Sequence, residues 1–253
     1  MNLLSGFAGI SLVQLLLVAG MALVASVVGG VAGYGTGALM PLVLVPLVGA
    51  EPVVPIIAIS ALFSNTSRAL AFKSYVDVRR AIIVMAAAIP TCILGAYGYT
   101  KLDNAGAALV IGAMLIVSVP LRRLLKHHGF SIGDRGLGIA SIGWGVVVGG
   151  TAGAGIILLS LLMAAGLEGA GVIATDAAIS IIIGIVKVGV FGISGIVGTQ
   201  VIAFALLIGL IALPGAFLAR KFVERMPVHV HTAILDIVVI VGGVFLIYGA
   251  WAR

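Results

Sequence analysis

Charge is scarce in this sequence. Only 9% of its 253 residues are charged, whereas a soluble domain carries about 25%. With 62% hydrophobic residues and a mean hydropathy of +1.33, too little polar surface is left to cover a globule in water. The low charge therefore excludes a water-soluble domain and predicts a chain that lies in lipid.

Cysteine is rarer still. The single cysteine, Cys92, lies in an apolar stretch, which excludes a disulfide framework and a thiolate metal site. Neither a Walker loop nor a dinucleotide fingerprint is present, so the sequence indicates no nucleotide cofactor. His127 and His128 are adjacent in a basic segment and lack the further ligands of a metal site. We expect no metal and no cofactor.

Long apolar stretches are abundant in place of charge. Several reach or exceed the ~20 residues that a helix needs to cross a bilayer, and none alternates as an outer-membrane strand does. The sequence therefore predicts an all-α membrane protein. The expected helical segments are 8–30, 38–49, 53–72, 80–100, 104–122, 136–150, 156–166, 171–190, 199–219 and 228–251.

The chain contains an internal repeat. Residues 27–35 recur 120 positions later as residues 147–155, with seven of nine positions identical. The same offset aligns the Gly-Ala pair at 49–50 with the pair at 169–170. Agreement on one offset at separated places predicts two homologous halves.

The halves are 1–125 and 133–253, joined by a cytoplasmic linker at 126–132. Each half contains five helical segments, and because five is odd, the second half enters the membrane from the opposite face. We therefore expect two inverted repeats. The segments 38–49, 136–150 and 156–166 are short for a full crossing, and Pro46 interrupts the first of these three. The first two segments of each half are therefore expected to form a broken or re-entrant hairpin whose Gly-rich turn lies near the midplane.

Basic residues orient the chain. They gather in the segments 73–80, 122–135 and 220–225, which places these loops in the cytoplasm of a bacterial inner membrane. Residues 192–199 carry no charge and residues 101–104 are balanced, so both are expected outside. This topology places both termini outside. The net charge of +6 thus reflects membrane orientation rather than nucleic-acid binding.

Each Gly-rich turn is followed by the start of a new helix, near residues 38 and 156. Helix N-termini offer free N–H groups and positive dipole ends, so two of them converging in lipid predict an anion site. The alternative is that the glycines only allow close helix packing. The residues expected to bind substrate at the turns are Gly33, Gly35, Thr36, Gly153 and Gly155.

The third segment of each half carries a polar stripe on one face. In the first half the stripe ends at Arg68; in the second, Asp176, Ser180 and Lys187 follow at i, i+4 and i+11. Polar groups at membrane depth usually face a bundle interior or a water path. The expected binding residues on the stripes are Ser60, Ser64, Asn65, Arg68, Thr175, Ser180 and Lys187.

Other roles remain open for the charged residues of the predicted helices. Arg68 and Lys187 lie near helix ends, where basic side chains can snorkel to the interface. Asp176 is a candidate for proton or cation coupling, with a role near a helix N-terminus as the alternative. Asp236 is a second coupling candidate, because His229 lies seven residues before it on the same face.

An intramembrane enzyme is the least favoured function. The run from Gly192 to Gly195 matches the GxSG pattern of rhomboid proteases. However, the expected topology puts Ser194 at one surface and the histidines His229 and His231 near the other. We predict no catalytic residue.

The chain resembles the TauE/SafE family of sulfite and organosulfonate exporters. The resemblance rests on the GG-x-x-G-x-G run at 29–35 followed by Pro46, on Ala58-Ile59-Ser60, and on the basic-aromatic loop at 73–80. The second Gly run at 149–155, with Ala174-Thr175 beyond it, also fits.

The resemblance implies a secondary transporter, usually an exporter, of sulfite or a related small anion, driven by an ion gradient. Alternating access would follow from rocking of the two halves. An anion channel of the same architecture is the alternative. The expected partners are a small anion and the lipid bilayer, without nucleic acid, and the sequence leaves a homo-oligomer open.

Overall fold

The computed structural model is helical throughout the part of the chain that it describes, which comprises residues 3–32, 35–127, 131–215, 218, 240–241 and 243–249. The helices with at least 17 residues are α1 (Leu12–Ala32), α3 (Val53–Ala71), α4 (Val78–Tyr99), α5 (Asn104–His127), α6 (Asp134–Gly150) and α8 (Gly169–Ile193). The shorter helices are α2 (Thr36–Val48), α7 (Gly155–Ala164) and α9 (Thr199–Ala212), with 3-10 turns η1 (Leu3–Phe7) and η2 (Lys73–Tyr75). The all-α prediction is confirmed for these residues, and most expected segments match a helix to within a few positions.

Five helices, α1, α3, α4, α5 and α8, are long and apolar enough to cross a membrane. Their outward faces carry large apolar side chains; on α1, for example, Leu16 and Leu17 are 63% and 61% exposed. Such a surface suits lipid rather than water. The chain is therefore a multi-pass membrane protein.

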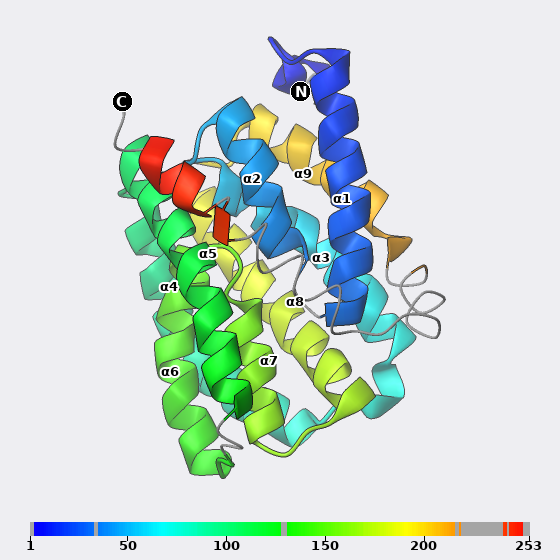
Figure 1. The fold of residues 1–253 in the computed structure, drawn as a ribbon, viewed down its shortest axis with the longest axis vertical. Helices are drawn as coiled ribbons and strands as arrows, with labels where there is room; N and C mark the ends of the chain where they lie inside the picture. The colour runs from blue at the N-terminus through cyan, green and yellow to red at the C-terminus, as the bar shows by residue number, and fades with distance from the viewer. Residues whose placement is uncertain are drawn as a thin grey trace.

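Helices α2 and α7 are too short to cross. At 1.5 Å per residue they span about 20 Å and about 15 Å, against a hydrocarbon core of about 30 Å. They occupy opposite ends of the molecule, α2 near the end that carries η1 and α7 near the end that carries η2 (Figure 1). The expectation that Pro46 interrupts the first short segment is wrong, because α2 runs unbroken through Pro41 and Pro46.

The outer end of α2 is held by side chains at the C-terminus of α4 and the N-terminus of α5. Asn104 Oδ1 accepts a hydrogen bond from the Ala50 amide (2.6 Å), and the Tyr99 hydroxyl donates one to the Ala50 carbonyl (2.7 Å). Since this end is fixed at the surface, the N-terminus of α2 points toward the middle of the bundle.

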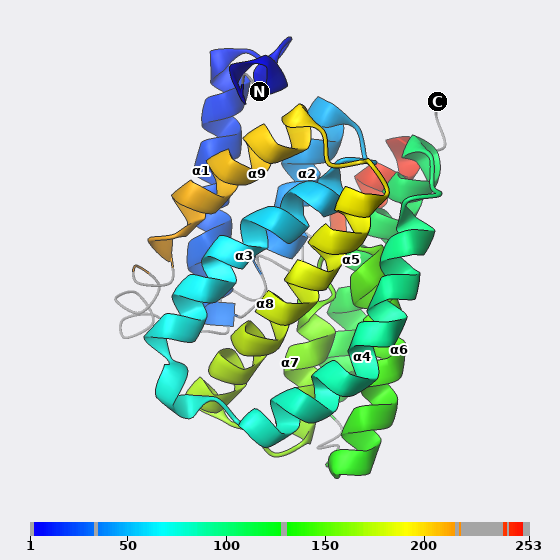
Figure 2. The same ribbon diagram turned by 180° about the vertical axis from the view of Figure 1, so that it is seen from behind.

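Helices of one half pack mainly on helices of the other. Helix α4 packs on α6, and α9 packs on α1; α3 packs on α9, and α8 packs on α4. The 120-residue offset relates α4 to α9 and α6 to α1, so the contact α4–α6 corresponds to the contact α9–α1. In the same way, the contact α3–α9 corresponds to the contact α8–α4. Helices α3 and α8 pack directly on each other at the centre (Figure 2).

Glycines let α4 and α6 approach at backbone distance. A Cβ added to Gly149 would lie 2.2 Å from the Cys92 carbonyl oxygen, and one on Gly145 would lie 2.5 Å from that of Ala88. The packing interpretation of the glycines is therefore right for these two positions. At the two turns, Gly35 and Gly37 are also in close backbone contact, and the turn glycines Gly35 and Gly153 line a cavity as well.

The loops fall at two ends of the bundle. An ion pair between Arg79 and Asp134 (2.5 Å) joins the start of α4 to the start of α6, so the segments 73–80 and 134–135 lie together. The connections α4–α5 and α8–α9 lie at the opposite end, with η1 (Figure 2). The third basic segment, 220–225, and most of the tenth expected segment lie outside the described residues.

Candidate functional site

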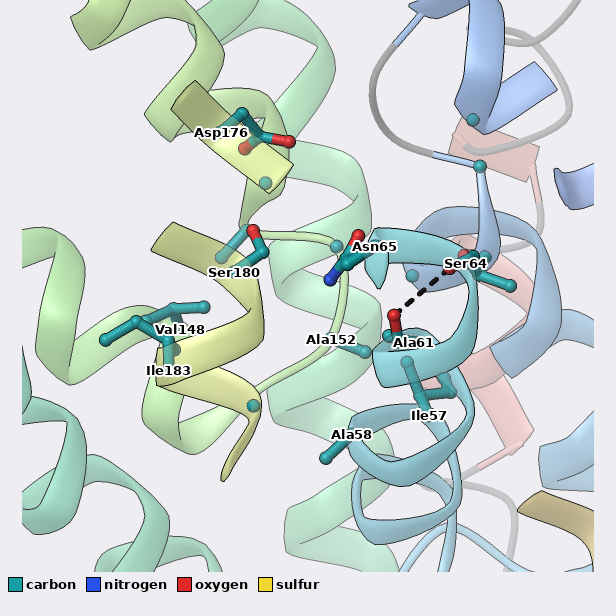
Figure 3. Close-up of a pocket in the computed structure, with 18 of the residues that line it drawn as sticks. Ile57, Ala58, Ala61, Ser64, Asn65, Val148, Ala152, Asp176, Ser180 and Ile183 are labelled. Carbon is teal, nitrogen blue, oxygen red and sulfur yellow. Dashed lines mark hydrogen bonds between the residues drawn. The ribbon is translucent and has the colours of Figure 1, made fainter. Parts of the chain in front are cut away.

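A cavity of about 130 Å³ lies at the centre of the bundle (Figure 3). It runs between α3 and α8, and the N-terminus of α2, the α6–α7 turn, α1 and α6 complete its wall. Each lining element of the first half has a counterpart in the second: α1 and α6, the two Gly-rich turns, and α3 and α8. A cavity needs only about 15 Å³ to admit one water, so this one has room for a small polyatomic ion.

The Gly-rich turns meet at the cavity. Gly35 and Gly153 both line it, and a Cβ on Gly37 would lie 2.8 Å from the Gly153 amide nitrogen. Gly35 also packs tightly against α1, because a Cβ added to Gly35 would lie within bonding distance of the Ala25 carbonyl oxygen. Gly153 has a φ of +87°, a conformation that side chains with a Cβ rarely adopt. Backbone contact at the meeting point therefore requires glycine.

Helices α2 and α7 both begin at the cavity wall. Their N-cap residues, Gly35 and Ala154, provide no side-chain hydrogen bond to the first turn. The first N–H groups of a helix have no intrahelical partner, and they carry the positive end of the helix dipole. Two such ends therefore face one small space.

Trp144 positions the second of these ends. Its indole Nε1 donates a hydrogen bond to the Ala154 carbonyl oxygen (2.9 Å), and its side chain is 3% exposed. This bond ties the body of α6 to the residue that precedes α7, so the turn between them is held in one conformation.

Lys187 is buried and binds the end of α6. Its Nζ donates to the carbonyl oxygens of Val148 (2.6 Å) and Thr151 (3.0 Å), and the residue is 7% exposed. A cation at a helix C-terminus is stabilised by the dipole and by the unpaired carbonyls. The ammonium charge therefore stays at the cavity, and the snorkelling alternative is wrong for Lys187.

Arg68 lies on the opposite wall, on α3, and is also 7% exposed. Its Nη2 donates to Asn65 Oδ1 (2.5 Å) and lies 3.1 Å from Asp176 Oδ2. This ion pair crosses from α3 to α8 toward the η2 end of the cavity. Snorkelling is wrong for Arg68 as well.

Asp176 lies seven residues after the start of α8, about two turns into the helix. The expectation of a role near the helix N-terminus is therefore wrong, since an N-cap side chain reaches only the first turn. In Figure 3, Asp176 and Ser180 project from α8 on the side that faces Asn65 of α3.

The structure brings together ten of the fourteen expected site residues. Those that line the cavity are Gly35, Thr36, Ser64, Asn65, Arg68, Gly153, Gly155, Asp176, Ser180 and Lys187. Ser64 donates locally to the Ala61 carbonyl (3.2 Å; Figure 3), as serines in membrane helices often do.

Four expected site residues are placed elsewhere or are not described. Ser60 is buried, donates to the Ile57 carbonyl (3.2 Å) and does not line the cavity. Thr175 accepts a hydrogen bond from the Asp77 amide (2.9 Å) and holds the loop before α4 instead. Gly33 and Asp236 lie outside the described residues.

Sequence reasoning missed several lining residues. Ser26 of α1, Trp144 of α6 and Thr151 of the second turn all contribute to the wall. Trp144 could have been noticed, because it is one of only two tryptophans and precedes a Gly run. The small apolar residues that complete the wall, such as Ala58 and Ala61, carry no sequence signal that distinguishes them from packing residues.

The enzyme alternative gains no support. Ser194 is the exposed residue at the C-terminus of α8, remote from the cavity lining. The histidines considered as its base lie outside the described residues. Within the described ranges, no three His, Cys, Asp or Glu side chains gather in a way that could hold a metal ion.

One comparison with known proteins identifies a relationship. A family model described as "Sulfite exporter TauE/SafE" matches residues 18–246, most of the chain. No curated protein and no solved structure matches. The matched range contains both Gly-rich turns and every described residue of the cavity wall.

Proposed function

Because this chain belongs to the sulfite exporter TauE/SafE family, we propose that it is a secondary transporter that exports a small sulfur-containing oxyanion, such as sulfite or an organosulfonate. The binding site is the central cavity. The proposal depends above all on one observation, that two helix N-termini without side-chain caps and two buried cations face the same small space.

The electrostatics of the cavity favour an anion. Arg68 and Lys187 each contribute a positive charge, and Asp176 offsets only one of them. The dipole ends of α2 and α7 add positive potential. In a medium of low dielectric such charges act strongly on a ligand, and the serine hydroxyls of Ser64 and Ser180 can donate to oxyanion oxygens.

The arrangement of the halves supports alternating access. The helix pairs α4–α6 and α9–α1 are related by exchange of the halves, as two inverted repeats would be. The cavity lies between α3 of one half and α8 of the other, so rocking of the halves would expose it to each side in turn. In this proposal α2 and α7 are the re-entrant helices.

Transport is coupled to an ion in this proposal, and the sequence carries no nucleotide-binding motif. The end of the bundle that carries η2 faces the cytoplasm, because the basic segments 73–80 and 134–135 lie there. In a bacterial inner membrane this orientation places both termini outside.

The test is counterflow in proteoliposomes. Vesicles loaded with unlabelled sulfite are diluted into labelled sulfite, and transient saturable accumulation of label is expected for a carrier. A channel would equilibrate the label without this overshoot. The variant Gly153→Val forces a β-branched residue into a φ of +87° and is expected to lose counterflow, whereas Ser194→Ala is expected to retain it. Absence of sulfite and organosulfonate flux in the unmodified protein would reject the function.

A further inference from the structure

Asp176 is a buried carboxylate with few interactions that would stabilise its negative charge. It is 1% exposed, and neither of its oxygens accepts a hydrogen bond from any residue that the structure describes. Among the described residues its close charged neighbour is Arg68, whose Nη2 lies 3.1 Å from Asp176 Oδ2 and also donates to Asn65 Oδ1. An ionised carboxylate at this depth is costly unless it is paired and hydrogen-bonded.

The other charged groups on α8 and α4 that the structure describes have partners elsewhere. On α8 itself, Lys187 lies eleven residues on, about 16 Å along the axis, and binds the carbonyls at the end of α6. Among the residues before and within α4, Asp77 and Arg80 pair with each other (2.6 Å).

The remaining elements packed on α8 contribute little charge near this site. Lys73 and Tyr75 of η2 are not buried, and Cys92 of α4 is a buried thiol. Helix α7 has no titratable residue in its whole length, Gly155–Ala164. The state of charge of Asp176 therefore depends mainly on Arg68.

Arg68 is also the group that a bound anion needs. It lines the cavity together with Asp176, so an oxyanion bound in the cavity lies beside the guanidinium. A guanidinium binds carboxylate and oxyanions with the same planar geometry. The anion and the Asp176 carboxylate are thus competing ligands for one cation.

We propose that the anion displaces Asp176 from Arg68 and that Asp176 takes up a proton from the aqueous phase in the same step, so that anion and proton cross the membrane together. In the empty site the Asp176 carboxylate pairs with Arg68 in the place that the anion would take. When the anion leaves, Asp176 releases its proton and pairs with Arg68 again. In this step the outward gradient of the anion drives both the anion and the proton out. The inference depends on the proposed function, because it assigns the coupling ion of the same cavity.

A sulfonate is the appropriate probe, because it stays a monoanion across the range in which the protein group titrates. Proteoliposomes that hold wild-type protein and a trapped pH dye receive an outward gradient of an alkyl sulfonate. We expect sulfonate efflux to carry protons outward, seen as alkalinisation of the lumen. In Asp176→Asn the number of protons moved per sulfonate is expected to fall by at least about tenfold, and the remaining sulfonate flux is expected to have a flat pH profile.

The surface variant Asp134→Asn is the matched control, since its carboxylate pairs with Arg79 at the end of the bundle. It is expected to keep the proton signal and the pH profile of the wild type. Sulfonate flux without proton movement in the wild type would overturn the inference and leave the transport function standing, whether or not Asp176→Asn folds. Proton movement that persists in Asp176→Asn would overturn it as well. Absence of both sulfonate and sulfite flux would instead reject the proposed function.

Discussion

Gly37 and Gly153 lie in backbone contact, one on the first turn of α2 and the other just before α7. A Cβ on Gly37 would lie 2.8 Å from the Gly153 nitrogen and 3.1 Å from its Cα, which is closer than side chains tolerate. The two residues come from different halves of the repeat. Their contact places two helix N-termini at one point, and the candidate anion site lies there.

Close packing of α4 on α6 is expected to fail when a methyl group is added between them. In Gly149→Ala the new Cβ would lie 2.2 Å from the Cys92 carbonyl oxygen, and overpacking of this kind costs about 1–3 kcal/mol. Thermal unfolding of the purified protein in detergent should show a lower midpoint. Gly143→Ala, whose Cβ meets no atom within 4 Å, is the control and should unfold at the wild-type temperature or slightly above. Equal midpoints for the two variants would contradict the packing described.

Loss of the Lys187 ammonium is expected to affect both stability and transport. In Lys187→Met the carbonyls of Val148 and Thr151 lose their donor, and a buried unsatisfied acceptor costs about 1–3 kcal/mol. Anion flux should fall at least about tenfold, because the cavity loses one of its two cations. The measurement is labelled-sulfite counterflow at matched protein content, with the unfolding midpoint recorded in parallel. A variant that transports at the wild-type rate would exclude Lys187 from the site.

The Arg68–Asp176 pair is expected to show strong coupling in a double-mutant cycle. Arg68→Gln leaves Asp176 buried without a counter-ion, a situation that costs about 3–5 kcal/mol. Adding Asp176→Asn removes the stranded charge, so the double variant should be more stable than Arg68→Gln alone. Unfolding midpoints of the four proteins measure the coupling. Additive effects would show that the two side chains do not interact.

The N-cap of α4 is expected to weaken in acid. The pKa of Asp77 is lowered because its carboxylate accepts the Arg80 backbone N–H (2.9 Å) and, further, because it pairs with the Arg80 guanidinium. A lowered folded-state pKa means that the stabilisation is present above the unfolded value of about 3.9 and is lost as the pH falls through the folded value. Asp77→Ala should cost about 1 kcal/mol at neutral pH, and the difference from wild type should shrink on acidification. A difference that stays constant down to the folded-state pKa would contradict the cap.

Much of the helical framework could be predicted from the sequence, because span length and the absence of charge are local properties. The expected segment 53–72 and the observed α3 (Val53–Ala71) differ by one residue. Pro46 misled the prediction, since a proline removes one backbone hydrogen bond but does not by itself end a helix that other elements hold in place. Helix α2 continues through it to Val48.

The candidate site was only partly predictable. A polar stripe in the sequence indicates which face of a helix is polar, but it does not indicate which residues of another helix that face contacts. Thr175 precedes Asp176 by one residue and so points about 100° around the helix, toward the Asp77 loop rather than the cavity. The pairing of Arg68 with Asp176 depends on how α3 packs against α8. No local pattern contains that information.

The central claim is that the meeting point of the two Gly-rich turns binds the anion. Its most direct test is equilibrium binding of sulfite to purified wild-type protein, Gly37→Val and Gly143→Val, each shown to be folded by its unfolding midpoint. We expect saturable binding to the wild type and to Gly143→Val, and at least about tenfold weaker binding to Gly37→Val, whose side chain would occupy the contact with Gly153. Equal affinity in all three proteins would contradict the account.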